Sequence, residues 1–390
     1  MSSRSFNICI KSALVVLVGA GTLVAQSTEF AIEGRPVQVH GFASQAFAAS
    51  DGNNYLTMDT RTGTFSFTDF GGNISVQVTG KFRVGAQFYD HNIGQLGRWH
   101  PQLDWADGDY RFKDWLGIRA GKVKTVLGLY NDTQDMEFLH TWAILPQSVY
   151  PLDLRSSTIA HVGADFYGDI GLNQLGTFSY TAYAGFQPND PYGGWVYGFK
   201  PYGINLTALD GRLEGGDLRW RTPVQGLLAG VSYMDEELHI KATILSAFSF
   251  NAVSNKDETS QFYIQYMRNR LTLNAEYRKN LLGLEKFIMD SRSLYGSASY
   301  RISKRFEVGT YYSRFYPNWQ DNLSDPANHI YDKVATVRMD LTNHWDLKIE
   351  GHFMNGSAAG DALRGFYLRD NPQGLKPTTN LLVIRTGVEF

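Results

Sequence analysis

The chain has 390 residues, including 24 Phe, 22 Tyr and 39 Gly, and its formal net charge is only −2. Because charges of both signs nearly cancel, the sequence gives no electrostatic case for nucleic-acid binding, which calls for a basic excess. The length fits either two soluble domains or one large barrel, and no Ser/Pro-rich, charged or low-complexity linker divides it.

The N-terminus is typical of a secretory signal peptide. A basic start precedes an uncharged apolar run at 13–25, which is too short to span a bilayer because about 20 residues are needed. Small residues follow, so we expect cleavage after Ala25 or Ser27. Residues 1–27 are then a cleaved signal peptide, and residues 28–390 form one mature domain. A retained membrane anchor is the alternative.

The rest of the chain excludes several kinds of site. The only cysteine, Cys9, lies inside the expected signal peptide, so the mature chain has neither a disulfide framework nor a thiolate metal site. The histidines show no spacing that argues for a metal, and we expect no cofactor. No later apolar run is long enough for a transmembrane helix. A membrane-bound form must therefore be a β-barrel, because helices and closed barrels are the only structures that span a bilayer.

From residue 37 onwards, short segments alternate apolar and polar side chains, as strands with two unlike faces do. In the clearest segment, 81–89, one face carries the apolar side chains Phe82, Val84, Ala86 and Phe88. The other face carries Lys81 and Arg83. A strand with two cations on its polar face suits a wall between lipid and water better than a soluble core.

Short and long connections alternate along the chain. Short turns are expected near Gly80, Lys113, Gly171, Pro223, Asn269, Ser303 and Asn343. Long polar loops are expected at 50–63, 90–100, 125–156, 187–214, 235–257, 281–291, 316–330 and 355–379. This asymmetry predicts an all-β, antiparallel transmembrane barrel of about 16 strands, with short periplasmic turns and long extracellular loops.

Two features of this prediction depend on further interpretation. Segment 238–250 is either loop or strand continued above the membrane, because counting it as a separate strand would give an odd number. A barrel of about 16 strands is also expected to have a water-filled interior rather than a packed one.

The last segment, 380–390, supplies the closing strand. Apolar or methyl-bearing residues occupy every second position from Leu382 to Phe390, with Arg385, Gly387 and Glu389 between them. In a soluble protein such a terminal strand would be an unprotected edge, whereas in a barrel it pairs with the first strand. The alternative is an ordinary C-terminal strand of a secreted all-β protein.

Loop 125–156 is the segment expected to carry function. It holds the acidic residues Asp132, Asp135, Glu137 and Asp153 beside an apolar stretch at 142–145. A loop this long with its own apolar anchor is not expected to move freely in water. We therefore expect it to fold into the lumen, where its carboxylates would face a basic wall and form a charged pore constriction.

The expected wall is rich in inward-pointing cations. They are Lys81, Arg83, Arg119, Lys124, Arg219, Arg221, Arg278, Arg338, Lys348 and Arg385. Inward carboxylates dilute this basic wall, so strong anion selectivity is not expected. They are Asp165, Glu276, Asp340, Glu350 and Glu389. Two alternatives stay open: the wall cations pair with neighbouring carboxylates to hold the wall together, and the loop acids are simply solvated.

The signal peptide, the alternating strands, the long early loop and the terminal Phe390 together resemble the bacterial outer-membrane porins. The stretch 116–135 (LGIRAGKVKTVLGLYNDTQD) is similar to the segment leading into the inward-folded loop of phosphate-selective and related gram-negative porins. The resemblance implies passive diffusion of small hydrophilic solutes or ions across the outer membrane, often by a homotrimer. It also implies that Phe390 serves as the assembly signal. The dense lysine and arginine ladder of a dedicated phosphate channel is not seen.

Two other functions compete with a pore. A barrel lipid hydrolase needs Ser and His brought together, and His161 and Ser179 could face each other across a hairpin. An adhesin or binding barrel would work through its external loops, and the aromatic loop 187–203 could stack on sugars. No motif singles out the hydrolase pair, and the aromatic loop could equally be an ordered surface loop.

Overall fold

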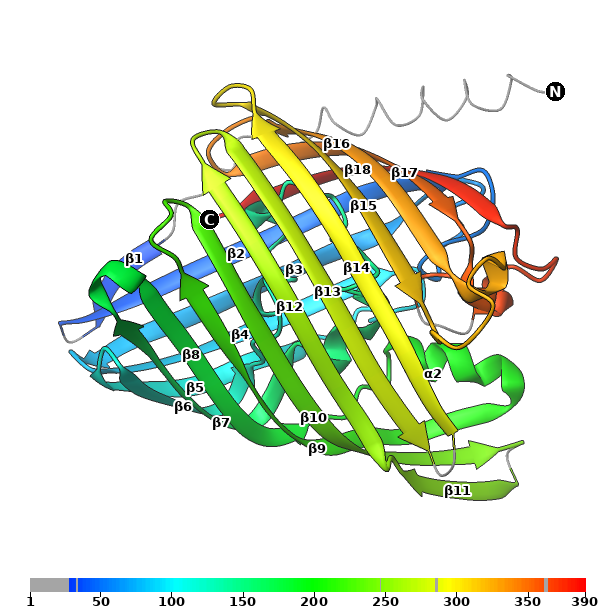
Figure 1. Ribbon diagram of the computed structural model, residues 1–390, viewed down its shortest axis with the longest axis horizontal. Helices are drawn as coiled ribbons and strands as arrows, with labels where there is room; N and C mark the ends of the chain where they lie inside the picture. The colour runs from blue at the N-terminus through cyan, green and yellow to red at the C-terminus, as the bar shows by residue number, and fades with distance from the viewer. Residues whose placement is uncertain (1–27, 33, 246, 285–286, 361–363) are drawn as a thin grey trace.

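Sixteen antiparallel strands close into a barrel in this computed structural model (Figure 1). It describes residues 28–390 apart from 33, 246, 285–286 and 361–363. The expected signal peptide, residues 1–27 with Cys9, lies outside the described residues. Strands adjacent in sequence are adjacent in the wall, and the last strand pairs with β2 to close it. The predicted architecture is therefore confirmed.

The barrel strands are evenly distributed along the chain. Those before the long early loop are β2 (Arg35–Ser50), β3 (Thr64–Thr79), β4 (Phe82–Ile93), β5 (Gln102–Lys113) and β6 (Leu116–Lys124). Those in the middle are β7 (Ala160–Gly171), β8 (Thr177–Gln187), β9 (Ile204–Arg221), β10 (Leu227–Ile244), β12 (Lys256–Arg268) and β13 (Leu271–Leu284). Those at the end are β14 (Phe287–Arg301), β15 (Phe306–Tyr316), β16 (Ile330–Asp340), β17 (Trp345–Asn355) and β18 (Thr378–Glu389).

Two short strands and several short helices supplement the wall. β1 (Thr28–Ile32) folds back on β2, and β11 (Phe248–Val253) folds back on the far end of β10. The helical turns are η2 (Asn131–Thr133), η3 (Glu137–Leu139), η4 (Leu152–Ser157), η5 (Asn173–Leu175), α2 (Gly194–Phe199), η6 (Lys200–Tyr202), η7 (Pro326–Asn328), η8 (Ala358–Gly360) and η9 (Leu368–Asp370). No helix among the described residues is long and apolar enough to cross a bilayer.

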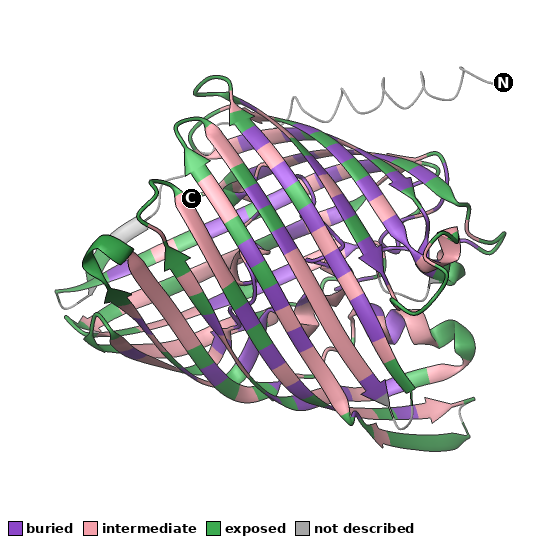
Figure 2. Cartoon of the chain, viewed as in Figure 1, coloured by how far each residue is buried: buried purple, intermediate pink, exposed green. Residues whose placement is uncertain are grey.

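The two faces of the wall differ as the alternation predicts, and the stripes of burial in Figure 2 follow it. Outward side chains are apolar and exposed: Phe88 is 61% accessible and Ile349 is 40% accessible. Inward neighbours are polar and buried, and Lys348 is 0% accessible. An apolar exterior around a polar interior is the arrangement that a surrounding bilayer stabilises.

The strand ends correct two predicted loops. All seven short turns occur where the sequence predicts them, but 235–257 and 281–291 are largely strand rather than loop. β10 runs on to Ile244 and pairs with β9 along nearly its whole length. Segment 238–250 is thus strand continued past the wall, followed by the start of β11, which the sequence did not predict. The pairing of β9 with β10 and of β13 with β14 continues through these segments, although their mixed composition suggested loops.

The seam of the barrel involves the last residue. Phe390 and Gly41 exchange two backbone hydrogen bonds of 2.9 Å each. The Phe390 ring lies where a β-carbon on Gly41 would be, so only glycine fits beneath the ring. The predicted role of Phe390 as an assembly signal stays a prediction, but its side chain does point outward from the closing strand.

The interior is fuller than a barrel of this size led us to expect. Inner wall side chains at mid-height, such as His161, Glu350 and His352, are at most 1% accessible. Folded loops cover them, and an apolar cluster that includes Leu56 and Phe366 fills part of the bore. The prediction of a largely open, water-filled interior is therefore wrong. Inward-folded loops occupy much of the volume that the strand number provides.

Candidate functional site

Loop 125–156 lies inside the barrel and is fixed by inward carboxylates. Glu350 on β17 accepts hydrogen bonds from the backbone N–H groups of Ala143 and Ile144, at 3.0 and 2.9 Å. Glu276 on β13 accepts one from the Tyr150 hydroxyl at 2.7 Å. Bonds to a charged acceptor are about twice as strong as neutral ones, so these carboxylates are strong anchors.

Inward arginines hold the same loop through its carbonyl groups. Arg338 donates to the carbonyl oxygens of Phe138 and His140, at 2.6 and 2.7 Å. Arg385 on β18 reaches the carbonyl of Ala143, and Arg219 on β9 reaches that of Gly128. Since β9 and β18 lie far apart around the barrel, the loop crosses the lumen from one side of the wall to the other (Figure 1).

The apolar stretch of the loop also meets the wall. Trp142 packs edge-on against Tyr311 of β15, with ring centroids 5.0 Å apart. Leu145, Val149 and Tyr150 belong to the same buried cluster. The prediction that residues 142–145 anchor the loop is confirmed, because these side chains leave water when the loop docks.

Two of the predicted loop acids meet cations. Asp135 lies 2.6 Å from Lys124 and 3.8 Å from Arg155. Although burial opposes ionisation, these two cations hold the pKa of Asp135 below its usual value. Glu137 forms an ion pair with Lys348, and despite burial Lys348 and Arg385 likewise lower the pKa of Glu137. Both carboxylates are therefore ionised at neutral pH.

The other two predicted acids differ. Asp153 does not face the basic wall: it accepts hydrogen bonds from the Gly365 N–H and the Tyr367 hydroxyl, at 2.8 and 2.7 Å. Burial raises its pKa. It therefore fastens this loop to the last long connection. Asp132 is half-buried, and its backbone carbonyl accepts a hydrogen bond from Lys124 at 3.0 Å.

The predicted wall cations are in ion pairs or bound to the loop. Arg119 lies 3.0 Å from Asp165, and Arg219 lies 3.0 Å from Asp217. Nearer the periplasmic rim the pairs are looser: the nitrogen–oxygen distance is 3.7 Å for Arg83 with Asp109 and 3.6 Å for Arg221 with Asp169. Arg278 donates to the Val149 carbonyl at 3.2 Å. The alternative that these cations hold the structure together is thus what the contacts show.

Lys81 is the exception among the predicted wall residues. It lies in the turn between β3 and β4, exposed to water, and donates to the Phe112 carbonyl at 3.3 Å. The strand begins at Phe82, so Lys81 precedes it and does not take part in the alternation of inward and outward side chains. Its predicted place on the lumen wall is wrong.

Sequence reasoning missed a second set of buried polar residues. Arg155, at the end of the loop, lies 2.7 Å from Asp104 and stacks over the Tyr89 ring at 4.0 Å. His352 is held between Asp332 at 2.8 Å and Glu350 at 3.1 Å. No sequence pattern marks Arg155 as a buried residue, because its partners lie on strands that are distant in sequence.

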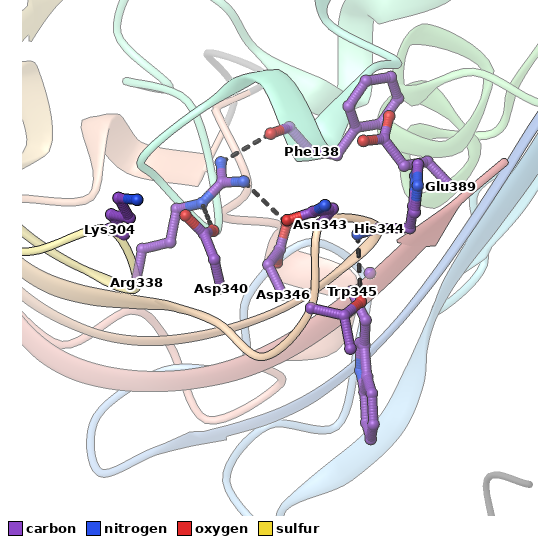
Figure 3. A pocket seen from close by; sticks show the side chains of 11 residues that line it. Phe138, Lys304, Arg338, Asp340, Asn343, His344, Trp345, Asp346 and Glu389 are labelled. Atoms are coloured by element: carbon purple, nitrogen blue, oxygen red, sulfur yellow. Dashed lines mark hydrogen bonds and ion pairs between the residues drawn. The ribbon is translucent and has the colours of Figure 1, made fainter. Parts of the chain in front are cut away.

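A cavity of about 350 Å³ lies on the periplasmic side of the loop (Figure 3). Phe138 forms its ceiling from the loop side, and Arg338, Asp340 and Asp346 line it from β16 and β17. The β16–β17 turn and Glu389 of β18 complete it. The cavity therefore lies between the inner loop and the β16–β17 turn.

The residues expected of a hydrolase are not brought together. His161 pairs with Thr125 at 2.9 Å and with Asp165 at 2.9 Å, whereas Ser179 lies further along β8, opposite Asp169. The predicted facing of His161 and Ser179 is wrong, because the hairpin register separates them. No group of three or more potential metal ligands occurs in the described part of the chain.

The aromatic loop 187–203 is folded rather than open. Trp195 and Phe199 of α2 stack on each other with centroids 5.8 Å apart and pack against β9 and β10. Tyr192 stacks on His100 of a neighbouring connection at 3.9 Å. These contacts agree with an ordered surface loop, since the stacking faces are already occupied.

No protein-family model matches the sequence, and no curated protein is significantly similar to it. Solved structures do match. The anion-selective porin from Comamonas acidovorans is 11% identical with a TM-score of 0.59, over 91% of this chain and 100% of that one. The outer-membrane protein OmpT of Vibrio cholerae is 9% identical with a TM-score of 0.58, over 93% and 100%.

Two further structures extend this similarity. OmpF of Salmonella typhi, in complex with daunomycin, is 10% identical with a TM-score of 0.56, over 93% of this chain and 100% of that one. The outer-membrane channel DcaP of Acinetobacter baumannii is 10% identical with a TM-score of 0.54, over 94% and 100%. At such low identity the likeness concerns the fold alone. The fold of this chain is that of the gram-negative outer-membrane porins.

Proposed function

We propose that this protein is a passive diffusion channel of the outer membrane for small hydrophilic solutes or ions, narrowed by loop 125–156. The observation that carries the proposal is the loop's course across the lumen, with anchors on β9, β13, β16, β17 and β18. A loop fixed on opposite sides of the wall sets the free cross-section, because a solute must pass beside it. Several solved porins and channels share the fold.

The charges facing the periplasmic half would act on passing solutes. Arg83 and Arg221 are about half accessible, and each sits next to a carboxylate. The cavity beneath the loop mixes Arg338 with Asp340 and Asp346. A solute therefore meets alternating signs of charge, which favours hydrated polar molecules over apolar ones without strong preference for one ion. Residues 28–390 would form this channel after removal of residues 1–27, and a trimer is the assembly we favour.

Bilayer recordings test this function. Purified protein should give stepwise currents in planar bilayers, with small steps because the loop fills much of the bore. Deleting 132–147 should increase the step size, because it removes the part of the loop that crosses the lumen together with its anchors at Phe138, His140, Ala143 and Ile144. The control is a deletion of residues 320–325 in an external loop, which should leave the steps unchanged. Absence of steps in the folded protein would refute the channel and favour a binding or adhesive barrel. Equal step sizes before and after the inner deletion would show that the loop does not narrow the conducting pathway.

A further inference from the structure

A strip of cations runs across the outer face of β13 to β16. Its members are Lys279, Arg292, Arg314 and Lys333. They are neighbours in the wall: Lys279 is directly opposite Arg292, and Leu294 beside Arg292 is opposite Arg314. Lys333 is opposite Tyr312, on the same face as Arg314. Arg292, Arg314 and Lys333 alternate with buried inward residues, so they point away from the lumen. Lys279 does so too, because its neighbour Arg278 points inward and donates to the Val149 carbonyl of the inner loop.

The strip lies at the extracellular edge of the apolar band. On β13 the outward residues from the periplasmic turn are Leu271, Leu273, Ala275 and Tyr277, and Lys279 comes next. That distance is roughly 27 Å of strand, or about 20 Å of depth at a tilt of about 40°, close to the ~25 Å height of an outer-membrane apolar band. On β16, Met339, Val337 and Ala335 precede Lys333, a shorter distance of roughly 20 Å of strand, or about 15 Å of depth. The strip thus follows the extracellular edge of the apolar band, within reach of lipid headgroups of the outer leaflet.

Carboxylates neutralise this strip only in part. Asp290 forms ion pairs with both Arg292, at 2.9 Å, and Lys279, at 3.8 Å. No ion pair is formed by Arg314 or Lys333 among the described residues. Arg314 instead donates to the Tyr312 hydroxyl at 3.0 Å. Cations that face headgroups without a counter-charge of their own attract anions, and partial dehydration at that depth strengthens the attraction.

Aromatic rings hold the strip in place. The Arg292 guanidinium stacks over Trp319 at 4.4 Å, and Arg314 lies 5.1 and 5.4 Å from the rings of Tyr312 and Tyr331. The hydroxyls of Tyr316 and Tyr331 are hydrogen-bonded to each other. Ordered guanidinium groups lose little entropy when they bind a planar or tetrahedral oxyanion.

The neighbouring sector of the same rim is different. On the outer face of β9, β10 and β12, carboxylates outnumber cations. The carboxylates are Asp210, Glu214, Asp235, Glu237 and Glu258, and the cations are Arg212, Lys241 and Lys256. Lys256 is also paired with Glu258 at 2.7 Å. The basic strip is therefore local and is not a general property of the extracellular rim.

We propose that this strip binds the phosphate groups of phosphorylated lipid headgroups in the outer leaflet. Guanidinium groups form forked hydrogen bonds with phosphate oxygens, and Lys333 adds a point charge. The adjoining Tyr and Trp rings would lie along sugar rings or the upper acyl chain, as aromatic side chains do at membrane interfaces. The lipid, rather than free phosphate, is the ligand because the strip faces the bilayer and continues an apolar wall. This proposal does not depend on conduction.

Binding of lipid A to the detergent-folded protein tests the proposal. Native mass spectrometry would compare diphosphoryl lipid A, monophosphoryl lipid A and phosphatidylcholine. The variant is Arg314→Gln with Lys333→Gln, and the matched control is Arg212→Gln with Lys241→Gln on the acidic sector. Each variant removes two outward cations, so simple loss of charge is the same in both.

We expect diphosphoryl lipid A to bind the unaltered protein most tightly and the strip variant to bind it about tenfold or more weakly, since each cation near a charged headgroup contributes about 1 kcal/mol. The control should bind as the unaltered protein does. Equal weakening in both variants, or equal binding of the three lipids, would overturn the proposal. Displacement of bound lipid A by millimolar inorganic phosphate would also overturn it, because the site would then recognise a free anion. Retained heat-resistant migration in electrophoresis would show that both variants are folded.

Discussion

The inner and outer faces of this barrel use the same cations in opposite ways. Inside, Lys348 is fully buried and bound to Glu137 and to that residue's carbonyl oxygen at 2.7 Å. Outside, Lys333 is exposed and forms no ion pair among the described residues. The two lie on neighbouring strands. The difference teaches that a buried cation needs a counter-charge to offset its lost hydration, whereas an exposed cation can remain unpaired and available for a ligand.

The largest expected effect breaks an inner pair. Lys348→Met would leave the Glu137 carboxylate buried without its cation, which costs about 3–5 kcal/mol. We expect the free energy of unfolding to fall by that amount in guanidinium titrations of the folded barrel. Lys333→Met, the outer counterpart, should change it by less than about 0.5 kcal/mol.

A second substitution distinguishes the effect of the Lys348–Glu137 ion pair from the effect of Lys348 packing. Adding Glu137→Gln to Lys348→Met removes the stranded charge and should restore part of the lost stability. If the double variant were as unstable as the sum of the two single variants, Lys348 would act through its packing and the contrast between the faces would fail.

Glu350→Gln is expected to have a smaller effect. The amide keeps the shape but replaces a charged acceptor of the Ala143 and Ile144 N–H groups with a neutral one, at a cost of about 1–2 kcal/mol. Loop 125–156 should then be released more often, so open-channel currents should become noisier. Ser254→Ala, which removes an acceptor on the distant β10–β12 connection, is the control. Unchanged noise would mean that other anchors suffice.

Charge selectivity should respond modestly. Arg83→Gln with Arg221→Gln removes two accessible cations of the periplasmic half and leaves Asp109 and Asp169 unpaired. We expect the reversal potential across a salt gradient to move by a few millivolts, of order 0.1 kcal/mol, toward cation preference. The outer variant Arg314→Gln should not move it. A strong preference for one ion sign in the unaltered protein would contradict a general porin.

The smallest effect concerns pH. The pKa values of Asp135 and Glu137 are held below their usual range, and burial lowers the pKa of His140 to about 4. A carboxyl with a depressed folded pKa contributes stability above its unfolded value and loses it as pH falls through the folded value. A histidine with a depressed folded pKa loses stability as pH falls below its unfolded value of about 6.5, because only the undocked form is then protonated. This part of the loop should therefore be fully docked above about pH 7 and begin to loosen below about pH 6.5 through His140. It should loosen further below about pH 4 as the two carboxyls are protonated. Conductance that stays constant from pH 7 down to pH 3 would contradict this prediction.

The fold could be predicted because alternation with a period of two is strict in a wall that separates lipid from water. A one-residue slip would turn Phe82 and Val84 into the lumen, so the pattern carries the register as well as the strand. The same reasoning failed at 281–291, which was interpreted as one long loop although β13 runs to Leu284 and β14 begins at Phe287. Pairing of the two strands continues to these residues, so the connection between them is short.

The site could be predicted only in outline. The apolar stretch and acids of 125–156 indicate an inward loop, but they do not say which acid meets which cation. Asp135 forms an ion pair with Lys124, whereas Asp153 accepts a hydrogen bond from the Tyr367 hydroxyl of the last long connection. Arg155 was missed altogether. Such pairings depend on chain segments far apart in sequence, and one sequence contains no signal of their proximity.

The anchors of the inner loop also bear on the order of assembly. The loop follows β6, yet residues that hold it belong to β13, β17 and β18, which are synthesised much later. Contacts of such long sequence separation form late, because a large loop of chain must close before they can stabilise anything. The wall must therefore be completed around a segment that is not yet in place. A newly inserted molecule would pass through a stage that is wider and leakier than the mature one.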